Sequence, residues 1–205
     1  MVRPRGNYAT ATASVDELIA LADEKGTPLW KALGTLMRGE LFALTGNASD
    51  AVRMFSSGIA ALRLTGATFW MSLWSSYLAK AYAELGQFDD ALSHIGEAIT
   101  AVEMTKERWY EAEVYRIAGE IALMSPERDA AKAEASFERA LAVAREQQAK
   151  SFELRAATSM ARLWRDQGKR DEARDLLAPV YGWFTEGFDT LDLKEAKALL
   201  EELTR

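Results

Sequence analysis

Residues 78–92 contain the end of one expected helix, a tight turn at Gly86 and the beginning of a second helix, and this arrangement recurs along the chain. Turn glycines stand at Gly46, Gly86 and Gly168, and the first interval is 86 − 46 = 40. The small residue early in each second helix recurs at Ala51, Ala91, Ala133 and Ala173, at intervals of 40, 42 and 40. A chain that repeats itself in this way must bury the apolar face of each unit against the next, so the periodicity predicts a stack of similar helix pairs.

A large aromatic residue opens each first helix. These residues are Trp30, Trp70, Tyr110 and Phe152, at intervals of 40, 40 and 42, and the two extra residues fall in the turn at residues 125–129. Because each repeat must seal against its neighbour, we expect the junction aromatics, with Trp109 and Trp164, to lie in the core. The roles of Trp183 and Phe184, near the end of the array, stay open.

The second repeat carries the spacing of the tetratricopeptide pattern, through Ala79, Tyr82, Gly86, Phe88, Ala91, Ile95 and Ala98. The chain therefore resembles the tetratricopeptide family. The resemblance implies an all-α fold, a right-handed superhelical array of antiparallel helix pairs. Each repeat here has about 40 residues rather than about 34, which indicates longer helices.

The repeat marks predict the boundaries of the domain. We expect a flexible tail at residues 1–12 and a single helical-repeat domain at 13–205, in which Ser14 and Glu17 have the spacing of a capping box for the first helix. The domain would comprise a partial-repeat helix at 13–26, repeats at 27–66, 67–105, 106–149 and 150–187, and a capping helix at 188–205.

Composition excludes several classes of protein. The 205 residues include no cysteine, so disulfides and thiolate sites are impossible. The formal charge of −6 comes with no basic segment that would suit nucleic acid, and no apolar run suggests a signal peptide or a membrane span. We therefore expect a cytoplasmic protein that binds neither nucleic acid nor membrane.

A closer resemblance covers most of the chain from about residue 15. The segments 121–126, 153–170 and 176–190 resemble the C-terminal repeat region of large bacterial signalling proteins that carry an adenylate/guanylate cyclase domain and an ATPase domain. This resemblance implies a regulatory region. The resemblance implies no catalytic activity for this chain, because the metal-binding aspartates of the cyclase and the phosphate loop of the ATPase have no counterpart in it.

No residue pattern indicates an enzyme. The only histidine, His94, has no metal-ligand spacing around it, and the adjacent Asp89 and Asp90 are better explained as helix-start residues. Gly168-Lys169 lacks the rest of a phosphate loop. We expect no catalytic residue, no metal and no cofactor.

Solenoid geometry predicts a candidate binding surface, because the first helices line the concave face. The aligned positions are Leu33, Leu36 and Glu40, then Leu73, Ser76 and Lys80, then Glu113, Arg116 and Glu120, then Arg155, Thr158, Arg162 and Arg165. Those that we expect to contact a partner are Glu40, Ser76, Lys80, Arg116, Glu120, Arg155, Arg162 and Arg165. Arginine at this density suits an acidic peptide, a carboxylate or a nucleotide-like anion. The competing interpretation is that neighbouring carboxylates neutralise these arginines.

The sequence thus favours a non-catalytic protein–protein interaction or regulatory module of a bacterial signalling protein. Its partner would be a protein or peptide segment on the concave face, or another domain of a larger parent protein. One alternative is a small-molecule sensor for an anion or nucleotide. A second alternative is a homo-oligomerisation module that buries its concave face or its N-terminal end against another copy.

Overall fold

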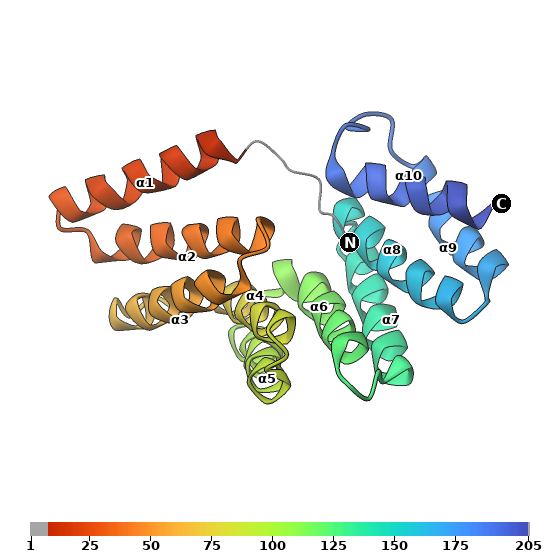
Figure 1. The fold of residues 1–205 in the computed structure, drawn as a ribbon, viewed down its shortest axis with the longest axis horizontal. Helices are drawn as coiled ribbons and strands as arrows, with labels where there is room; N and C mark the ends of the chain where they lie inside the picture. The colour runs from red at the N-terminus through yellow and green to blue at the C-terminus, as the bar shows by residue number, and fades with distance from the viewer. Residues whose placement is uncertain (1–7, 205) are drawn as a thin grey trace. The chain divides into compact units, whose positions relative to one another are not determined.

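A computed structural model describes residues 8–204, which are all-helical with no strand among them. The helices are α1 (Ala9–Glu24), α2 (Pro28–Leu44), α3 (Ala48–Leu64), α4 (Met71–Glu84), α5 (Phe88–Thr105), α6 (Glu111–Met124), α7 (Ala130–Glu146), α8 (Lys150–Asp166), α9 (Arg170–Gly182) and α10 (Leu191–Leu203), with a single 3₁₀ turn, η1 (Arg108–Tyr110), before α6 (Figure 1). Pairs α2–α3, α4–α5, α6–α7 and α8–α9 pack most extensively, so the predicted all-α fold of adjacent helix pairs is confirmed.

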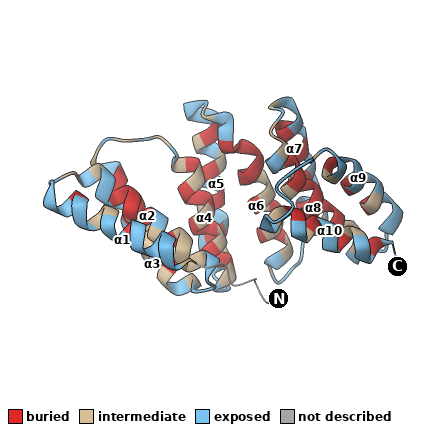
Figure 2. Cartoon of the chain, turned by 90° about the horizontal axis from the view of Figure 1, so that it is seen from above, coloured by how far each residue is buried: buried red, intermediate tan, exposed pale blue. Residues whose placement is uncertain are grey.

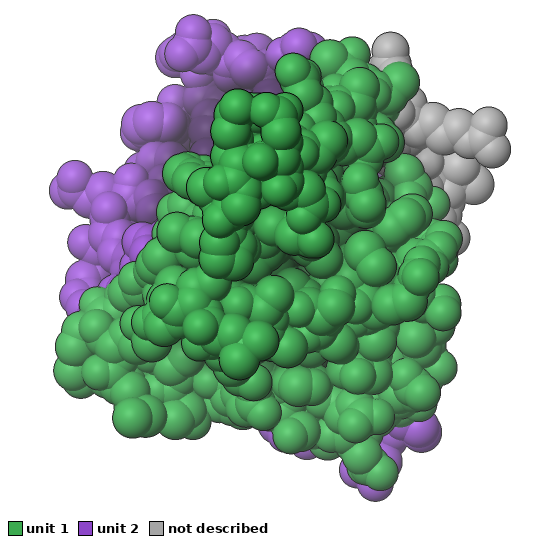
Figure 3. Space-filling model, turned by 90° about the vertical axis from the view of Figure 1, so that its left-hand side faces the viewer, with its two compact units in different colours: residues 1–107 green, residues 108–205 purple. Residues whose placement is uncertain are grey.

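The chain forms two compact units, residues 1–107 and residues 108–205, which Figure 3 colours separately. Unit 1 packs around Phe55, Leu36 and Leu62, and unit 2 around Phe137, Met160 and Leu177. Buried residues follow the facing sides of the paired helices (Figure 2). That residues 13–205 form one continuous array stays a prediction.

The turn glycines act as the sequence predicts. Gly46, Gly86 and Gly168 have φ of 83°, 77° and 83°, the left-handed region in which a side chain is unfavourable. After Gly86, the backbone N–H of Gln87 donates to the carbonyl of Tyr82 at 3.0 Å, and this bond closes the helix in a Schellman motif. The longer third turn instead starts its helix with Asp129, whose carboxylate accepts from the backbone N–H of Lys132 at 2.9 Å.

Two repeats hold their helices together with a phenylalanine against a glycine. A Cβ built at Gly39 would lie 2.9 Å from Cδ1 of Phe55, and one at Gly119 would lie 2.5 Å from Cε1 of Phe137. No room for a methyl group exists at either glycine. The corresponding positions of the other two repeats hold an alanine and a smaller aliphatic residue, Ala79 with Ile95 and Ala161 with Leu177, all of them buried.

The beginning of the domain differs from the prediction. Residues 1–7 of the predicted tail lie outside the described residues, but α1 already begins at Ala9, so the tail does not extend to residue 12. Ser14 therefore lies inside α1 and does not cap it. Four alanine and threonine positions at 9–12 continue the helix because nothing in them stops it.

The prediction that all junction aromatics lie in the core is wrong for three tryptophans. Tyr110 is buried, but Trp30, Trp70 and Trp109 are exposed. Trp70 is the N-cap residue of α4 in a left-handed conformation, with φ of 61°, and its ring packs edge-on against Phe69 instead of entering the core. Trp164 packs partly buried against the core of unit 2.

The last helix, α10, packs against both α8 and α9. It buries Leu193, Ala196, Leu199 and Leu203, whereas Lys194, Lys197 and Glu201 are exposed. It therefore occupies the position that the first helix of a further repeat would take, and its outer face is polar. Between residues 8 and 204, no helix has the length and apolar character needed to span a bilayer.

Candidate functional site

In unit 1 the structure separates the predicted partner-binding residues by burial. Glu40 on α2 and Lys80 on α4 are half-buried and border the solvent. Ser76 is completely buried, and its hydroxyl donates to the carbonyl of Leu73 at 2.8 Å. The prediction that Ser76 contacts a partner is therefore wrong, because the residue lies on a buried side of α4 and not on its solvent-facing surface.

In unit 2 the central predicted residue, Arg116 of α6, is part of a buried ion cluster. Its guanidinium donates to both carboxylate oxygens of Glu113, at 2.6 and 2.8 Å, and it also hydrogen-bonds Glu120. Across to the next first helix, it lies 3.4 Å from the hydroxyl of Ser159. Four of the five N–H groups of the guanidinium therefore have acceptors within the unit.

Burial and charge act in opposite directions on this cluster. Burial by itself would raise the pKa of Glu113, but the charge and the hydrogen bonds of Arg116, with the charge of Arg155, lower the pKa below its ordinary value. Burial likewise would lower the pKa of Arg116, yet Glu120 and Glu113 hold it above its usual range. Both groups therefore stay ionised at neutral pH, as a structural pair rather than a proton donor and acceptor.

The other three predicted arginines lie on α8 and pair with carboxylates of α10. Arg155 donates to Asp192 at 2.7 Å, Arg162 to Glu195 at 2.6 Å and Arg165 to Glu202 at 3.0 Å. Arg155 also reaches Glu113 of α6 at 3.5 Å. These contacts join α6, α8 and α10 through one row of ion pairs, so the neutralised arrangement is the one that the structure contains.

Sequence reasoning missed the α10 carboxylates, because it treated the last helix only as an apolar cap. Asp192, Glu195 and Glu202 are 3 and then 7 residues apart, whereas Arg155, Arg162 and Arg165 are 7 and then 3 apart, so no shared spacing in the sequence indicated these pairs.

Glu111 was also missed: it lies buried at the start of α6 between Arg108 at 2.7 Å and Arg139 at 2.8 Å. Acidic residues in a first turn are commonly dismissed as helix-dipole partners, which hides an ion pair of this kind.

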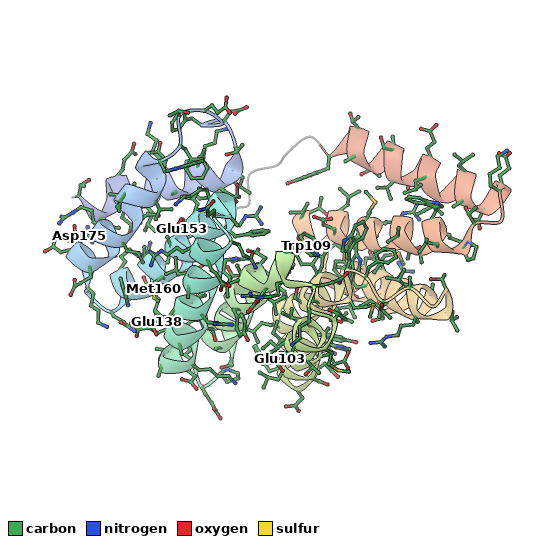
Figure 4. All side chains as sticks on the ribbon, turned by 180° about the vertical axis from the view of Figure 1, so that it is seen from behind. Glu103, Trp109, Glu138, Glu153, Met160 and Asp175 are labelled. Carbon is green, nitrogen blue, oxygen red and sulfur yellow. The ribbon has the colours of Figure 1, made fainter. Side chains whose placement is uncertain are left out.

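Glu153 occupies the position of Glu111 in the following repeat, at the start of α8 (Figure 4). It is buried and accepts from Arg145 at 2.9 Å and from Lys150 at 2.7 Å. Burial would raise the pKa of Glu153, but these two donors lower it below the ordinary value. The side chains of Arg145 and Lys150, with Gln148 and the exposed Trp183, also line an open hollow of about 460 Å³, and Nζ of Lys150 lies 5.7 Å from the centre of the Trp183 ring.

Asp89, Asp90 and His94 were considered as possible catalytic or metal-binding residues, and each has contacts or a position that stabilises the fold. Asp89 and Asp90 lie in the first turn of α5. His94 stacks on Tyr82 with ring centres 5.5 Å apart and nearly parallel planes, and its Nδ1 lies 3.5 Å from Glu97. In the part of the chain that the structure describes, no three metal-ligating side chains come together.

Unit 1 has an exposed apolar stripe instead of an ion cluster. Trp30, Met37 and Leu44 of α2 are spaced seven residues apart and lie on one side of the helix, with 54%, 42% and 38% of their surface exposed. Leu21 of the neighbouring α1 is also exposed, at 50%. These four residues are called the N-terminal face below.

No protein-family model matches the chain, and no curated protein matches it. Among solved structures it is similar to a Podosopora anserina kinesin light chain with nearly identical TPR-like repeats, at 15% identity over 98% of this chain and 90% of that chain, with a TM-score of 0.58. A substituted form of such a protein from the same organism aligns at 16% identity over 86% of each chain, with a TM-score of 0.61. At these identities the likeness shows the fold, a TPR-like array of helical repeats.

Proposed function

We propose that the chain is a non-catalytic module that binds a protein partner. Three features support this. The fold is that of TPR-like repeats, the buried charges are paired with one another in ways that suit structure rather than catalysis, and large apolar side chains stand exposed on a first helix. The expected setting is the regulatory region of a bacterial cyclase–ATPase signalling protein in the cytoplasm, as the sequence resemblance implies.

The observation that carries the proposal is the exposed stripe of Trp30, Met37 and Leu44. Single exposed apolar residues are ordinary, but these three stand on one side of the same helix, and tryptophan is enriched among the residues that dominate binding energy. Glu40 and Lys80, which the sequence assigned to the partner site, lie on α2 and α4 of the same unit. The arginines of unit 2 instead hold α10, so we place partner binding in unit 1.

Capture from a lysate of the source cell tests this function. We expect immobilised wild-type chain to retain a defined protein, and Met37→Asp to lose it, because a charge would be buried at the interface. Leu64→Asp is the matched control, since Leu64 is 90% exposed at the end of α3 and outside the stripe. Retention of the same proteins by Met37→Asp, or of none by wild type, would contradict the proposal.

A second candidate function, an anion sensor, is favoured by the hollow between Arg145, Gln148, Lys150 and Trp183. Two cations share one carboxylate, Glu153, which leaves positive charge beside an exposed aromatic ring. Thermal-shift measurements with inorganic phosphate and with nucleotides test it. A stabilisation that disappears in Lys150→Ala and Trp183→Ala would favour the sensor, and no shift in wild type would exclude it for these anions.

A further inference from the structure

The two first helices α6 and α8 of unit 2 begin with the same arrangement of charges. Glu111 of α6 and Glu153 of α8 are equivalent, since 153 − 111 = 42, and both are buried. The cation three residues before the acid is Arg108 in one repeat and Lys150 in the next, and it pairs with that acid at 2.7 Å in both. The Glu111 junction and the Glu153 junction can therefore be compared charge by charge.

At the Glu111 junction the charges balance. Two cations, Arg108 and Arg139, pair with Glu111 at 2.7 and 2.8 Å. A second acid, Glu146 at the end of α7, accepts from both terminal nitrogens of Arg108 at 3.0 Å. This bidentate contact is the geometry in which a guanidinium holds a carboxylate most firmly. Two acids therefore face two cations.

At the Glu153 junction two cations face one acid. Arg145 and Lys150 both pair with Glu153, at 2.9 and 2.7 Å. Arg145 uses only its Nε in this pair, and its two terminal nitrogens have no acceptor among residues 8–204. Its side chain is 53% exposed. The junction thus has one positive charge in excess and guanidinium donors that point to solvent.

The second acid is displaced because α9 ends earlier than α7. The alanines early in these two helices are 40 residues apart, so Glu146 corresponds to Glu186 and Val143 to Trp183. Helix α7 continues to Glu146, whereas α9 ends at Gly182. Glu186 therefore lies beyond the helix, exposed and without an ion pair in the described part of the chain. Trp183 is 58% exposed, whereas Val143 is completely buried.

The side chains of the Glu153 junction surround the open hollow of about 460 Å³ that Arg145, Gln148, Lys150 and Trp183 line. This volume is in the range of small-molecule sites. Two cations that share one acid lie beside an exposed indole ring, and Nζ of Lys150 is 5.7 Å from the centre of that ring. A ligand that satisfies both needs an anionic group for the cations and a flat apolar group for the indole.

We propose that this hollow binds a small anion that carries a flat ring, either a mononucleotide or an aromatic carboxylic acid. The anionic group takes the part that the Glu146 carboxylate has beside Arg108, and the ring packs on Trp183. This deepens the proposed anion sensing and rests on it, and it involves no residue of the N-terminal face. Inorganic phosphate should bind less well, because it leaves the indole uncovered.

Calorimetric titration of the full chain tests the proposal with adenosine monophosphate, its two fragments ribose phosphate and adenosine, and benzoate. We expect adenosine monophosphate to bind at least about tenfold more tightly than either fragment, because each fragment satisfies only one part of the hollow. Tighter binding of benzoate than of adenosine monophosphate would identify the ligand as a carboxylic acid, and the reverse would identify it as a nucleotide.

Gln148→Glu is the sharpest variant, because it supplies the second acid within the hollow with almost no change in size. We expect it to weaken adenosine monophosphate at least about tenfold. Trp183→Ala should reduce adenosine monophosphate to the affinity of ribose phosphate, and Lys150→Ala should weaken both phosphates. Trp109→Ala and Arg174→Ala, matched residues of unit 2 that do not line the hollow, should change no affinity.

Three outcomes would overturn the proposal: neither adenosine monophosphate nor benzoate binds more tightly than ribose phosphate, or binding is unchanged in Gln148→Glu, or it is unchanged in Trp183→Ala. Thermal unfolding of each variant separates a loss of binding from a loss of the fold. If adenosine monophosphate and ribose phosphate bind equally and both are weakened in Lys150→Ala, the anion sensor stands and the flat-ring ligand is wrong. If no probe binds to wild type, both are wrong, whereas lysate capture through Met37 is a separate result.

Discussion

The two units form the same helix pairs, but at equivalent positions unit 1 has apolar side chains where unit 2 has charged ones. At one repeat position unit 1 has Leu33 and Leu73, and unit 2 has Glu113 and Arg155. The leucines pack within or beside the apolar core, whereas the charged pair forms part of an ion network that joins α6, α8 and α10. Buried ions are expensive to desolvate, so each must keep its partners. Unit 2 is thus fixed by mutual pairing, and unit 1 retains apolar surface for something else.

The largest expected loss of stability comes from removing one member of the buried ion cluster in unit 2. Arg116→Ala leaves Glu113 buried with only Arg155 at 3.5 Å, and we expect unit 2 to lose about 3–5 kcal/mol of unfolding free energy. Urea denaturation measures the loss, and amide exchange should locate it in α6 and α8. A loss below about 1 kcal/mol would mean that the ion cluster is dispensable.

The double variant Glu113→Leu with Arg116→Leu sharpens the same point, because it gives unit 2 the residues that repeat 1 has at Leu33 and Leu36. Replacement of a buried ion pair by apolar residues is often neutral or stabilising, so we expect most of the Arg116→Ala loss to be recovered. A double variant as unstable as Arg116→Ala would show that the pairing itself, and not only the uncompensated charge, holds the unit.

The glycine–phenylalanine contacts predict the next largest effect. Gly119→Ala places a methyl group 2.5 Å from the Phe137 ring, and overpacking of this kind should cost about 1–3 kcal/mol in thermal or urea unfolding. Adding Phe137→Leu, which reproduces the Ala161 with Leu177 combination of repeat 4, should restore part of the stability. No cost for Gly119→Ala alone would show that the helices can move apart freely.

Acid should distinguish the units by a smaller, graded effect. The folded-state pKa values of Glu113 and Glu153 lie below the ordinary 4.5, so their stabilisation is present above pH 4.5 and is lost as pH falls from there through the folded values. Amide exchange in moderate urea at pH 7 and pH 4 should show unit 2 opening more readily at pH 4, relative to unit 1. Glu153→Gln should reduce this pH dependence, whereas equal acid sensitivity of both units would contradict it.

The smallest expected effect concerns the partly exposed pairs to α10. Arg162→Ala removes the 2.6 Å contact with Glu195, and exposed or half-exposed pairs contribute about 0–1 kcal/mol. Faster amide exchange confined to α10 is the expected observation. Loss of the whole of unit 2 would show instead that α10 is essential to its core.

Repetition made the helix pairs predictable, because the same turn glycines and small residues recur and each has a local physical role. Both α2 and α3 lie within the repeat expected at 27–66. The burial of Ser76 and the exposure of Trp30 were not predictable, since both depend on which neighbouring helix is present at that position. The arginines were correctly assigned to the first helices, but their partners on α10 lie 33–37 residues away in sequence, beyond any local pattern.

Repeats with a glycine–phenylalanine contact alternate along the chain with repeats that have an alanine and an aliphatic residue at the same positions. This alternation has a consequence for the ancestry of the chain. Gly39 and Gly119 are 80 residues apart, and Phe55 and Phe137 are 82 apart, so the full pattern of the interior returns only after two repeats. Each compact unit contains one repeat of either type. The pattern is that expected if a block of two helix pairs was duplicated as a whole, and it makes that block, rather than the single repeat, the segment to exchange when hybrids of such chains are made.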